Sequence, residues 1–240
     1  MPKPSPDWFD RLPGNRCLAE FSMWSADLCN LSRDVERIAP HADMLHVDVA
    51  DGVFAPQLLY FPDLVAAVRR CSATPIHVHL MIDDAILLDQ VAQFAEAGAD
   101  LISVHAENRR APEAIALIHA RGLLAGAVLR VESALDTVEA LLPSLSVVTL
   151  LGTAIGVKGV GLADTAPARI SAMRRIVAGS RNGRRQIVAA DGGIRDHTVP
   201  VLAAAGAQTV VMGSLAFGAP DLAARIAWLH GLTVGSGDAG

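Results

Sequence analysis

The chain has 240 residues, of which 52% are hydrophobic and 19% charged, a balance that supports one large core and excludes an intrinsically disordered protein. The formal net charge of −5 offers no basic face for nucleic acid. No apolar run approaches the roughly 18 residues of a membrane span, and the N-terminus lacks the apolar stretch of a signal peptide. The three cysteines lack CxxC spacing, so we expect a reduced, cytoplasmic protein without disulfides or a zinc knuckle.

Short apolar runs alternate with amphipathic helical patterns along most of the chain. Eight of these runs predict β-strands, at residues 17–24, 44–49, 76–81, 101–106, 123–129, 146–151, 186–191 and 209–214. The spacing between them predicts helices, for example over residues 84–98 and 164–179. The phrases FAEAGADLISV and LAAAGAQTVVM share one order of helix end, glycine and strand, which indicates a repeated βα unit.

Strands that alternate with helices over this length predict an α/β protein with a single (β/α)8 barrel, the TIM barrel. A doubly wound sheet is the alternative, but the glycine fingerprint GxGxxG does not follow the first strand. We expect an N-terminal extension at residues 1–16, the barrel at residues 17–230 and a flexible C-terminal tail at residues 231–240.

Several of these apolar strands carry polar side chains at their C-terminal ends. The active site of a (β/α)8 barrel lies at this end of the strands. His46 and Asp48 lie two residues apart and share one face of a strand, while His79 and Asp191 end two other strands. If these side chains face inward, two imidazoles and two carboxylates converge, a set suited to a divalent metal ion. His77 lies one layer deeper on the face of His79, and we expect it to be structural.

Two glycine-containing turns follow the last two strands, where barrels commonly bind phosphate on backbone amides. Close backbone approach and free N–H groups predict phosphate binding at Gly192, Gly193, Gly213 and Ser214. The glycine-rich loop at residues 151–161 carries one cation, Lys158. This loop is either a lid over a substrate or a flexible surface loop.

Four segments of the chain resemble, in this order, motifs of the ribulose-phosphate 3-epimerase family. They are LHVDVADGVFAPQL (45–58), VHLMID (78–83), EAGADLISVHAE (96–107) and ADGGI (190–194). The resemblance extends from FSMWSADL to MGSLAFG and implies a metal-dependent isomerase on a (β/α)8 barrel. Such an enzyme inverts C3 of a phosphorylated ketose, such as ribulose 5-phosphate, by deprotonation and reprotonation through an enediolate.

The resemblance also implies roles for individual residues. One divalent ion per subunit (zinc, iron, manganese or cobalt) would be held by His46, Asp48, His79 and Asp191. Asp48 and Asp191 would exchange the C3 proton on opposite faces of the substrate. Together with the phosphate turns, the expected substrate-binding residues are Ser22, His79, Met81, Gly192, Gly193, Gly213, Ser214 and Lys158. We expect a small phosphorylated sugar as the partner, no nucleic acid or membrane, and a homo-oligomer.

The chain departs from the family's pattern at four places. Phe21 and Ser22 stand where the family usually has proline and serine in the first strand. Ala50 stands where the family usually has methionine, and Val53 stands where it usually has histidine. The loop LLGTAIGVKG replaces the family's typical NPGFGGQ and gains Lys158. Because this loop covers the substrate in the family, an epimerase of a tetrulose 4-phosphate or a hexulose 6-phosphate is an alternative.

Two other classes of protein are alternatives to an epimerase. A phosphosugar lyase or decarboxylase on a similar barrel generally needs a strand lysine, and Lys3 and Lys158 are the only lysines of the chain. A non-catalytic phosphosugar-binding protein has no need of paired acids, so the pair Asp48 and Asp191 favours an enzyme.

Overall fold

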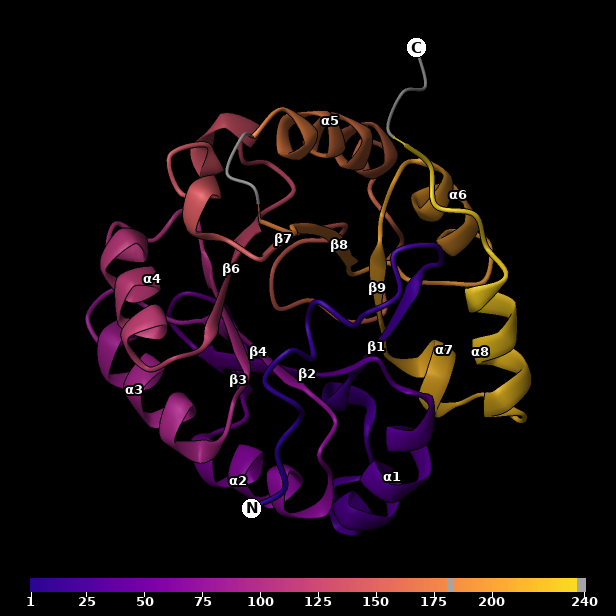
Figure 1. Cartoon of the computed structure of the whole chain (residues 1–240), viewed down its shortest axis with the longest axis horizontal. Coiled ribbons are helices and arrows are strands. Elements are labelled where there is room, and N and C mark those ends of the chain that lie inside the picture. Colours follow the sequence, from indigo (N-terminus) through magenta and orange to yellow (C-terminus); the bar gives the residue numbers. More distant parts are fainter. Residues whose placement is uncertain (181–183, 237–240) are drawn as a thin grey trace.

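The computed structural model describes residues 1–180 and 184–236. Parallel strands form a closed barrel, since β1 pairs with both β2 and β9 (Figure 1). The barrel strands are β1 (Leu18–Ser22), β2 (Met44–Asp51), β4 (Ile76–Met81), β5 (Leu101–His105), β6 (Leu124–Leu129), β7 (Val147–Leu151), β8 (Ile187–Asp191) and β9 (Thr209–Met212). The predicted (β/α)8 barrel is confirmed, and the strand bounds differ from the predicted ones by at most two residues.

Helices surround the barrel and cover the outer faces of its strands (Figure 1). They are α1 (Leu31–Ile38), α2 (Pro62–Cys71), α3 (Leu87–Ala97), α4 (Ala111–Ala120), α5 (Ala166–Gly179), α6 (Val199–Ala204), α7 (Ser214–Phe217) and α8 (Leu222–His230). Between β6 and β7 the expected helix is replaced by two short 3-10 turns, Leu135–Val138 and Leu142–Ser144. Pro143 lies inside this stretch and prevents a continuous helix because it lacks a backbone N–H.

One strand was not predicted from the sequence. β3 (Leu58–Leu59) pairs antiparallel with Ala50 and Asp51 at the end of β2. Oδ1 of Asp51 accepts hydrogen bonds from the backbone N–H groups of Val53 and Phe54, which fixes the turn that starts this hairpin. A two-residue strand is too short to show periodicity, so only the turn residues carried a signal.

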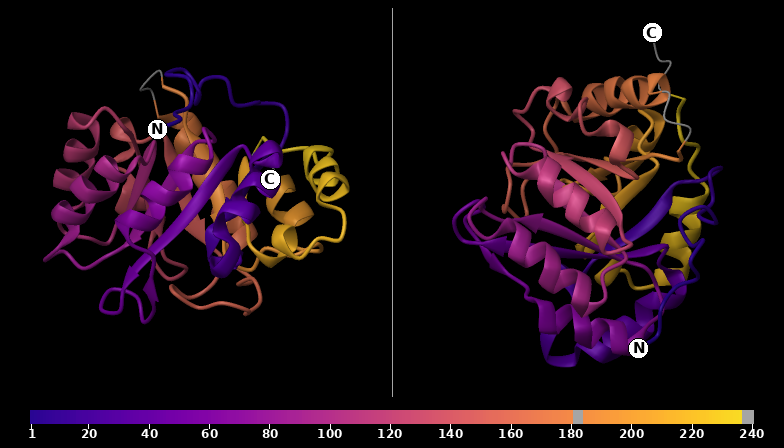
Figure 2. Two further views of the ribbon diagram at one scale, coloured as in Figure 1. Left: turned by 90° about the horizontal axis from the view of Figure 1, so that it is seen from below. Right: turned by 60° about the vertical axis from the view of Figure 1, so that its left-hand side comes forward.

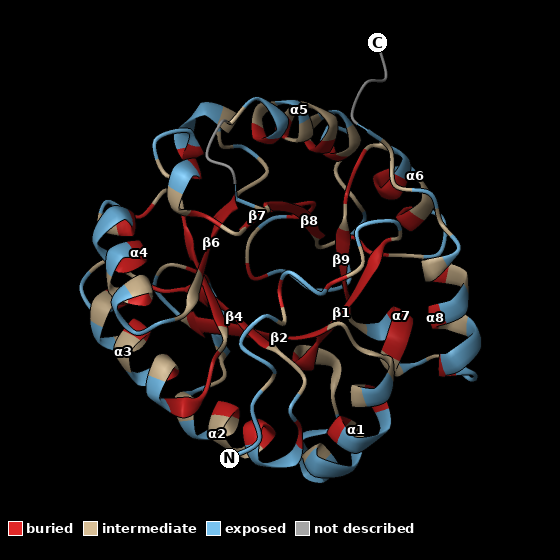
Figure 3. Cartoon of the chain, in the orientation of Figure 1, coloured by how far each residue is buried: buried red, intermediate tan, exposed pale blue. Residues whose placement is uncertain are grey.

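The barrel strands are almost fully buried because helices cover one face and the barrel interior covers the other (Figure 3). Continuous apolar runs therefore mark these strands in the sequence better than alternation does. Within the described residues, no helix combines the length and the apolar character required to cross a membrane.

The N-terminal residues close one end of the barrel. Phe9 and Leu12 pack against inward-facing side chains of the strands, among them Leu18 and Met44. The guanidinium of Arg185 donates hydrogen bonds to the carbonyls of this segment, at 3.1 Å for Phe9 and 2.6 Å for Leu12. Figure 2 shows this segment at the end of the barrel opposite the 52–58 loop. We call residues 5–13 the floor segment.

A fully buried arginine joins α2 to the turn between α3 and β5. Arg69 donates from Nε to the carbonyl of Gly98 at 3.1 Å and from Nη1 to the carbonyl of Ser72 at 3.0 Å, and it forms an ion pair with Asp100. Gly98 ends α3 with a φ of 107°, and a Cβ there would lie 2.9 Å from Arg69 Cγ. The arginine therefore requires a glycine at this position.

Candidate active site

The four predicted metal ligands converge at the carboxyl ends of β2, β4 and β8. The register between β2 and β4 places Asp48 beside His79. His46 Nε2 lies 3.1 Å from Asp48 Oδ1, and His79 Nδ1 lies 3.2 Å from the same oxygen. The Oδ2 atom of Asp191 lies 3.9 Å and 3.8 Å from these two nitrogens. All four donor atoms lie within 4.8 Å of one another.

This donor set fits a divalent metal ion. Nitrogen and carboxylate ligands bind such ions at about 2.0–2.2 Å, so two ligand atoms of one ion lie no more than about 4.4 Å apart. Each of the four nitrogen-to-oxygen distances falls below that limit. The absence of thiolate among the four residues favours ions that accept nitrogen and oxygen together, such as zinc, iron, manganese and cobalt.

The protein groups by themselves give the two carboxyls opposite pKa shifts. Burial alone would raise the pKa of Asp48, but the imidazoles of His46 and His79 hold it well below its usual value. Burial and then the charge of Asp48 raise the pKa of Asp191 to about 6. Despite burial, Asp48 and Glu20 raise the pKa of His46, so an ion bound there displaces a proton. One carboxylate stays ionised while the other titrates near neutral pH.

A second buried layer lies directly under the metal ligands. Glu20 Oε1 accepts hydrogen bonds from Nδ1 of His46, at 2.7 Å, and from Nδ1 of His77. The other ring nitrogen of His77 lies 2.6 Å from the Ser103 hydroxyl. Burial alone would raise the pKa of Glu20, but the two imidazoles keep the group ionised. His77 thus lies one layer below the pocket, as expected from its position in the sequence.

His79, His105 and Glu107 form a hydrogen-bonded series of side chains that leads away from the metal ligands. His79 Nε2 lies 3.0 Å from His105 Nε2, and His105 Nδ1 lies 3.0 Å from Glu107 Oε2. Burial lowers the pKa of His105 to about 4. Burial alone would raise the pKa of Glu107, but hydrogen bonds from His105, Ser133 and the Arg130 backbone lower it to about 2. At neutral pH the carboxylate of Glu107, the last member of this series, is therefore ionised.

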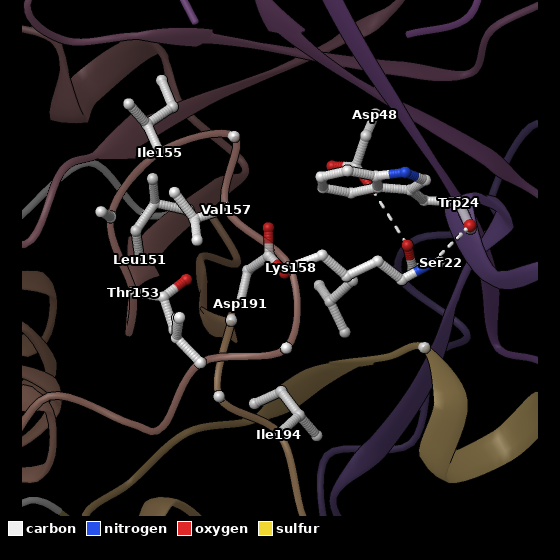
Figure 4. Close-up of a pocket in the computed structure, with 18 of the residues that line it drawn as sticks. Ser22, Trp24, Asp48, Leu151, Thr153, Ile155, Val157, Lys158, Asp191 and Ile194 are labelled. Carbon is white, nitrogen blue, oxygen red and sulfur yellow. Dashed lines mark hydrogen bonds between the residues drawn. The ribbon is translucent and has the colours of Figure 1, made fainter. Parts of the chain in front are cut away.

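A pocket opens above the ligands (Figure 4). Ser22 lies at its wall and donates a hydrogen bond of 3.0 Å to Asp48 Oδ2. His46 is fully buried beneath the wall. The other predicted site residues that line the pocket are Asp48, His79, Met81, Lys158, Asp191, Gly192, Gly193, Gly213 and Ser214. The structure thus brings the whole predicted set to one place.

The loop after β7 covers this pocket. Lys158 crosses the opening, donates a hydrogen bond of 2.8 Å to the carbonyl of Trp24 and lies 5.3 Å from the centroid of the Trp24 ring (Figure 4). Ile155 packs with the apolar group of Ala50, Ala55 and Met81. The loop is therefore anchored to residues on both sides of the pocket.

Backbone conformation and close packing both favour glycine at the two positions after β8. Gly192 and Gly193 adopt φ values of 85° and 70°, which favour glycine. A Cβ on Gly192 would lie 2.4 Å from Thr153 Oγ1, and one on Gly193 would lie 2.7 Å from the Leu162 backbone. These contacts account for the two glycines without a ligand, so phosphate binding there stays a prediction.

Sequence reasoning missed several residues of the site. Trp24, Thr153 and Arg195 line the pocket, and Glu20 and Glu107 contact histidines next to it. Glu20 carried a usable signal, since it is a charged residue inside an apolar strand, two positions before Ser22 and on the same face. The others lie in loops or beyond strand ends, where charged and aromatic residues are common.

The comparisons with known proteins agree with the motifs. The sequence model of the ribulose-phosphate 3-epimerase family matches residues 18–217. The chain belongs to this family. It is 32% identical to the ribulose-phosphate 3-epimerase of Bacillus subtilis over 212 residues, which cover 88% of this chain and 96% of that one. It is 33% identical to the ribulose-phosphate 3-epimerase of Synechocystis, covering 86% and 90%. The chain is accordingly an isomerase of the epimerase class.

Solved structures support the fold. A 3-hexulose-6-phosphate synthase from Salmonella typhimurium is similar with a TM-score of 0.69, covering 90% of this chain and 97% of that one. An orotidine 5'-phosphate decarboxylase from Pyrococcus horikoshii has a TM-score of 0.60. Sequence identities of 15% and 14% mean that these two likenesses concern the barrel architecture alone.

Proposed function

We propose that the protein is a metal-dependent 3-epimerase of a phosphorylated ketose of the ribulose 5-phosphate type. The observation that carries the proposal is the arrangement of Asp48 and Asp191, which come from different strands and both border the pocket beside His46 and His79. Epimerisation next to a ketone needs one group to remove a proton and a second to deliver one from the other face. Two carboxyls with opposite pKa shifts suit these tasks.

Asp48 is ionised and takes the C3 proton in one direction of the reaction, while Asp191 delivers a proton to the opposite face. The two roles exchange in the reverse direction. Ser22, which donates to Asp48 Oδ2, holds this carboxylate in place beside the substrate. The divalent ion, held by His46, Asp48, His79 and Asp191, would stabilise negative charge on the substrate oxygens.

The phosphate end of the substrate belongs near Gly192, Gly193, Gly213 and Ser214, with Lys158 across the opening. Met81 belongs to the apolar group against which the loop side chain Ile155 packs, and both residues line the pocket. The loop that carries Ile155 differs in sequence from the family's usual loop. The number of carbons in the ketose therefore stays open to test. Assembly into a homo-oligomer and a cytoplasmic location are further predictions.

The test is incorporation of deuterium from solvent at C3. Ribulose 5-phosphate, a tetrulose 4-phosphate and a hexulose 6-phosphate are each incubated in D2O, with and without a chelator. We expect exchange and epimerisation of ribulose 5-phosphate that stop when the ion is removed. Exchange with the four- or six-carbon sugar alone would assign the alternative substrate. Exchange with none of them would overturn the proposal.

Replacing the acid groups tests their roles. In Asp191→Asn we expect epimerisation to fall by at least about 1,000-fold, because general acid–base groups contribute about 10²–10⁴-fold and this residue would also help to hold the ion. The matched control is Asp196→Asn, which removes an exposed carboxylate five residues along the chain that pairs with Arg225. Full epimerisation by the Asp191 variant would contradict the assignment.

A further inference from the structure

Each histidine of the metal cluster has a second ring nitrogen that faces away from the pocket. His46 directs Nε2 to the cluster, so its Nδ1 faces the barrel interior. His79 is reversed, since its Nδ1 faces the cluster and its Nε2 faces β5. A metal ligand must offer a nitrogen without a proton, and the partner of the other nitrogen decides whether this form is favoured.

On the His46 side the partner is a carboxylate in direct contact. Glu20 is completely buried, and its Oε1 lies 2.7 Å from His46 Nδ1. An ionised carboxylate only accepts hydrogen bonds, so Nδ1 must carry the proton. The same oxygen accepts from His77 Nδ1, and the Ser103 hydroxyl donates to the far nitrogen of that ring. Because Nδ1 of His46 is bound to Glu20, Nε2, which faces Asp48, is the nitrogen left to bind an ion.

On the His79 side the carboxylate acts through one intermediate. Glu107 Oε2 accepts from His105 Nδ1 at 3.0 Å, so His105 Nε2 has no proton and is an acceptor. His79 Nε2, 3.0 Å away, must then be the donor. Its Nδ1 is left free toward Asp48 and Asp191. The backbone N–H of Arg130 and the Ser133 hydroxyl donate hydrogen bonds to the other oxygen of Glu107. These bonds keep Glu107 an acceptor and so fix the donor-to-acceptor direction of the hydrogen bonds from His79 to Glu107.

We propose that Glu20 and Glu107 are positioning residues that set opposite tautomers of the two histidine ligands. His46 is protonated on Nδ1 and binds the ion through Nε2, whereas His79 is protonated on Nε2 and binds through Nδ1. This inference rests on the metal site of the proposed function. The two carboxylates also place negative charge behind the imidazoles, which makes each ring a stronger ligand.

The first test reads the tautomers directly. Histidine ring ¹⁵N–¹H correlation spectra of the zinc-loaded protein show which nitrogen of each ring carries a proton. We expect opposite forms for His46 and His79, and the Nδ1-protonated form for His105. The same protonated nitrogen on both ligands would overturn the proposal. A wild-type protein that binds no divalent ion would refute the metal site of the proposed function, and this inference with it.

The second test measures the affinity for Zn²⁺ alone, in competition with a chelator and without substrate. In Glu107→Gln and Glu20→Gln we expect affinity to fall 10- to 100-fold, with the change in tautomer confined to His79 and His105 in the first variant. The matched control Glu113→Gln removes an exposed carboxylate that pairs with Arg110, and it should bind as the wild type does. Glu107→Asp should restore part of the affinity.

A purely structural role gives a different result. In that case the variants lose thermal stability without the ion but bind Zn²⁺ with unchanged affinity, and this outcome would contradict the proposal. Glu107 is partly exposed, at 22% of its side chain, so its variant is expected to fold. If Glu20→Gln does not fold, the wild-type spectrum still decides the tautomer of His46.

Discussion

The carboxylates of Asp48 and Asp191, which come from β2 and β8, both face the same two imidazole nitrogens. His46 Nε2 and His79 Nδ1 lie 3.1 Å and 3.2 Å from Asp48, and 3.9 Å and 3.8 Å from Asp191. Asp48 is therefore the closer partner and keeps its negative charge, which in turn disfavours ionisation of Asp191. The site therefore holds two carboxyls of the same type whose pKa values are shifted in opposite directions.

This difference predicts a pH dependence of stability in the presence of a chelator. The pKa of Asp191 is raised to about 6 in the folded protein, against about 3.9 when unfolded. Its protonated form thus contributes stability that is full below about pH 4 and is lost as the pH rises through 6. Asp191→Asn is neutral throughout, so we expect its advantage in Tm over the wild type to grow between pH 4 and 7. The gain is at most about 3 kcal/mol, and an advantage that does not change with pH would contradict the assignment.

Lys158 offers a test of phosphate binding. Replacing it in Lys158→Met removes a cation that lines the pocket, and we expect KM to rise roughly tenfold, about 1.4 kcal/mol of binding. Because the phosphate does not change in the reaction, kcat should stay within about twofold. The only other lysine gives the matched control, Lys3→Met. A fall in kcat with unchanged KM would show that the lysine acts on the reacting end of the substrate instead.

Arg69 is predicted to be essential for stability. In Arg69→Met the carbonyls of Gly98 and Ser72 and the carboxylate of Asp100 lose a buried partner. We expect a loss of about 3–5 kcal/mol, or roughly 6–20 °C in Tm. Thermal unfolding followed by circular dichroism measures this. Its exposed neighbour provides the control Arg70→Met, for which the change should stay within about 0.5 kcal/mol; equal losses in both variants would contradict the prediction.

The three cysteines should differ in reactivity. Burial raises the pKa of the Cys17 thiol to about 12, whereas Cys29 and Cys71 are exposed. Since the thiolate is the reactive form, a chromogenic disulfide reagent at pH 8 should titrate two thiols rapidly and the third only after unfolding. Rapid reaction of all three would show that the segment around Cys17, directly before β1, opens in the native protein.

The fold could be predicted because its strands are buried on both faces. Each of the eight barrel strands reads as a mainly apolar run, and the structure places each within two residues of its predicted bounds. The two-residue strand β3 and the 3-10 turns between β6 and β7 were not predicted. Both are set by single turn residues such as Asp51 and Pro143, whose effect depends on what the chain packs against.

The site was predictable to the extent that its residues interrupt apolar strands. His46, Asp48 and His79 stand out in this way, and their positions two apart or at strand ends indicated a shared face. The contacts of Glu107 depend on residues far along the chain, such as Arg130 and Ser133. Sequence spacing carries no information on such contacts, so a partner of this kind becomes visible only in three dimensions.

The floor segment affects how the protein can be shortened. The match to the family's sequence model begins at residue 18 of this chain. It therefore leaves out Phe9 and Leu12, which cover the interior side chains at that end of the barrel. A chain trimmed to the shared region would leave Leu18 and Met44 facing water at an open end of the barrel. Such a fragment would expose an apolar surface and would therefore tend to aggregate during expression. It would do so even though every residue of the catalytic pocket would still be present.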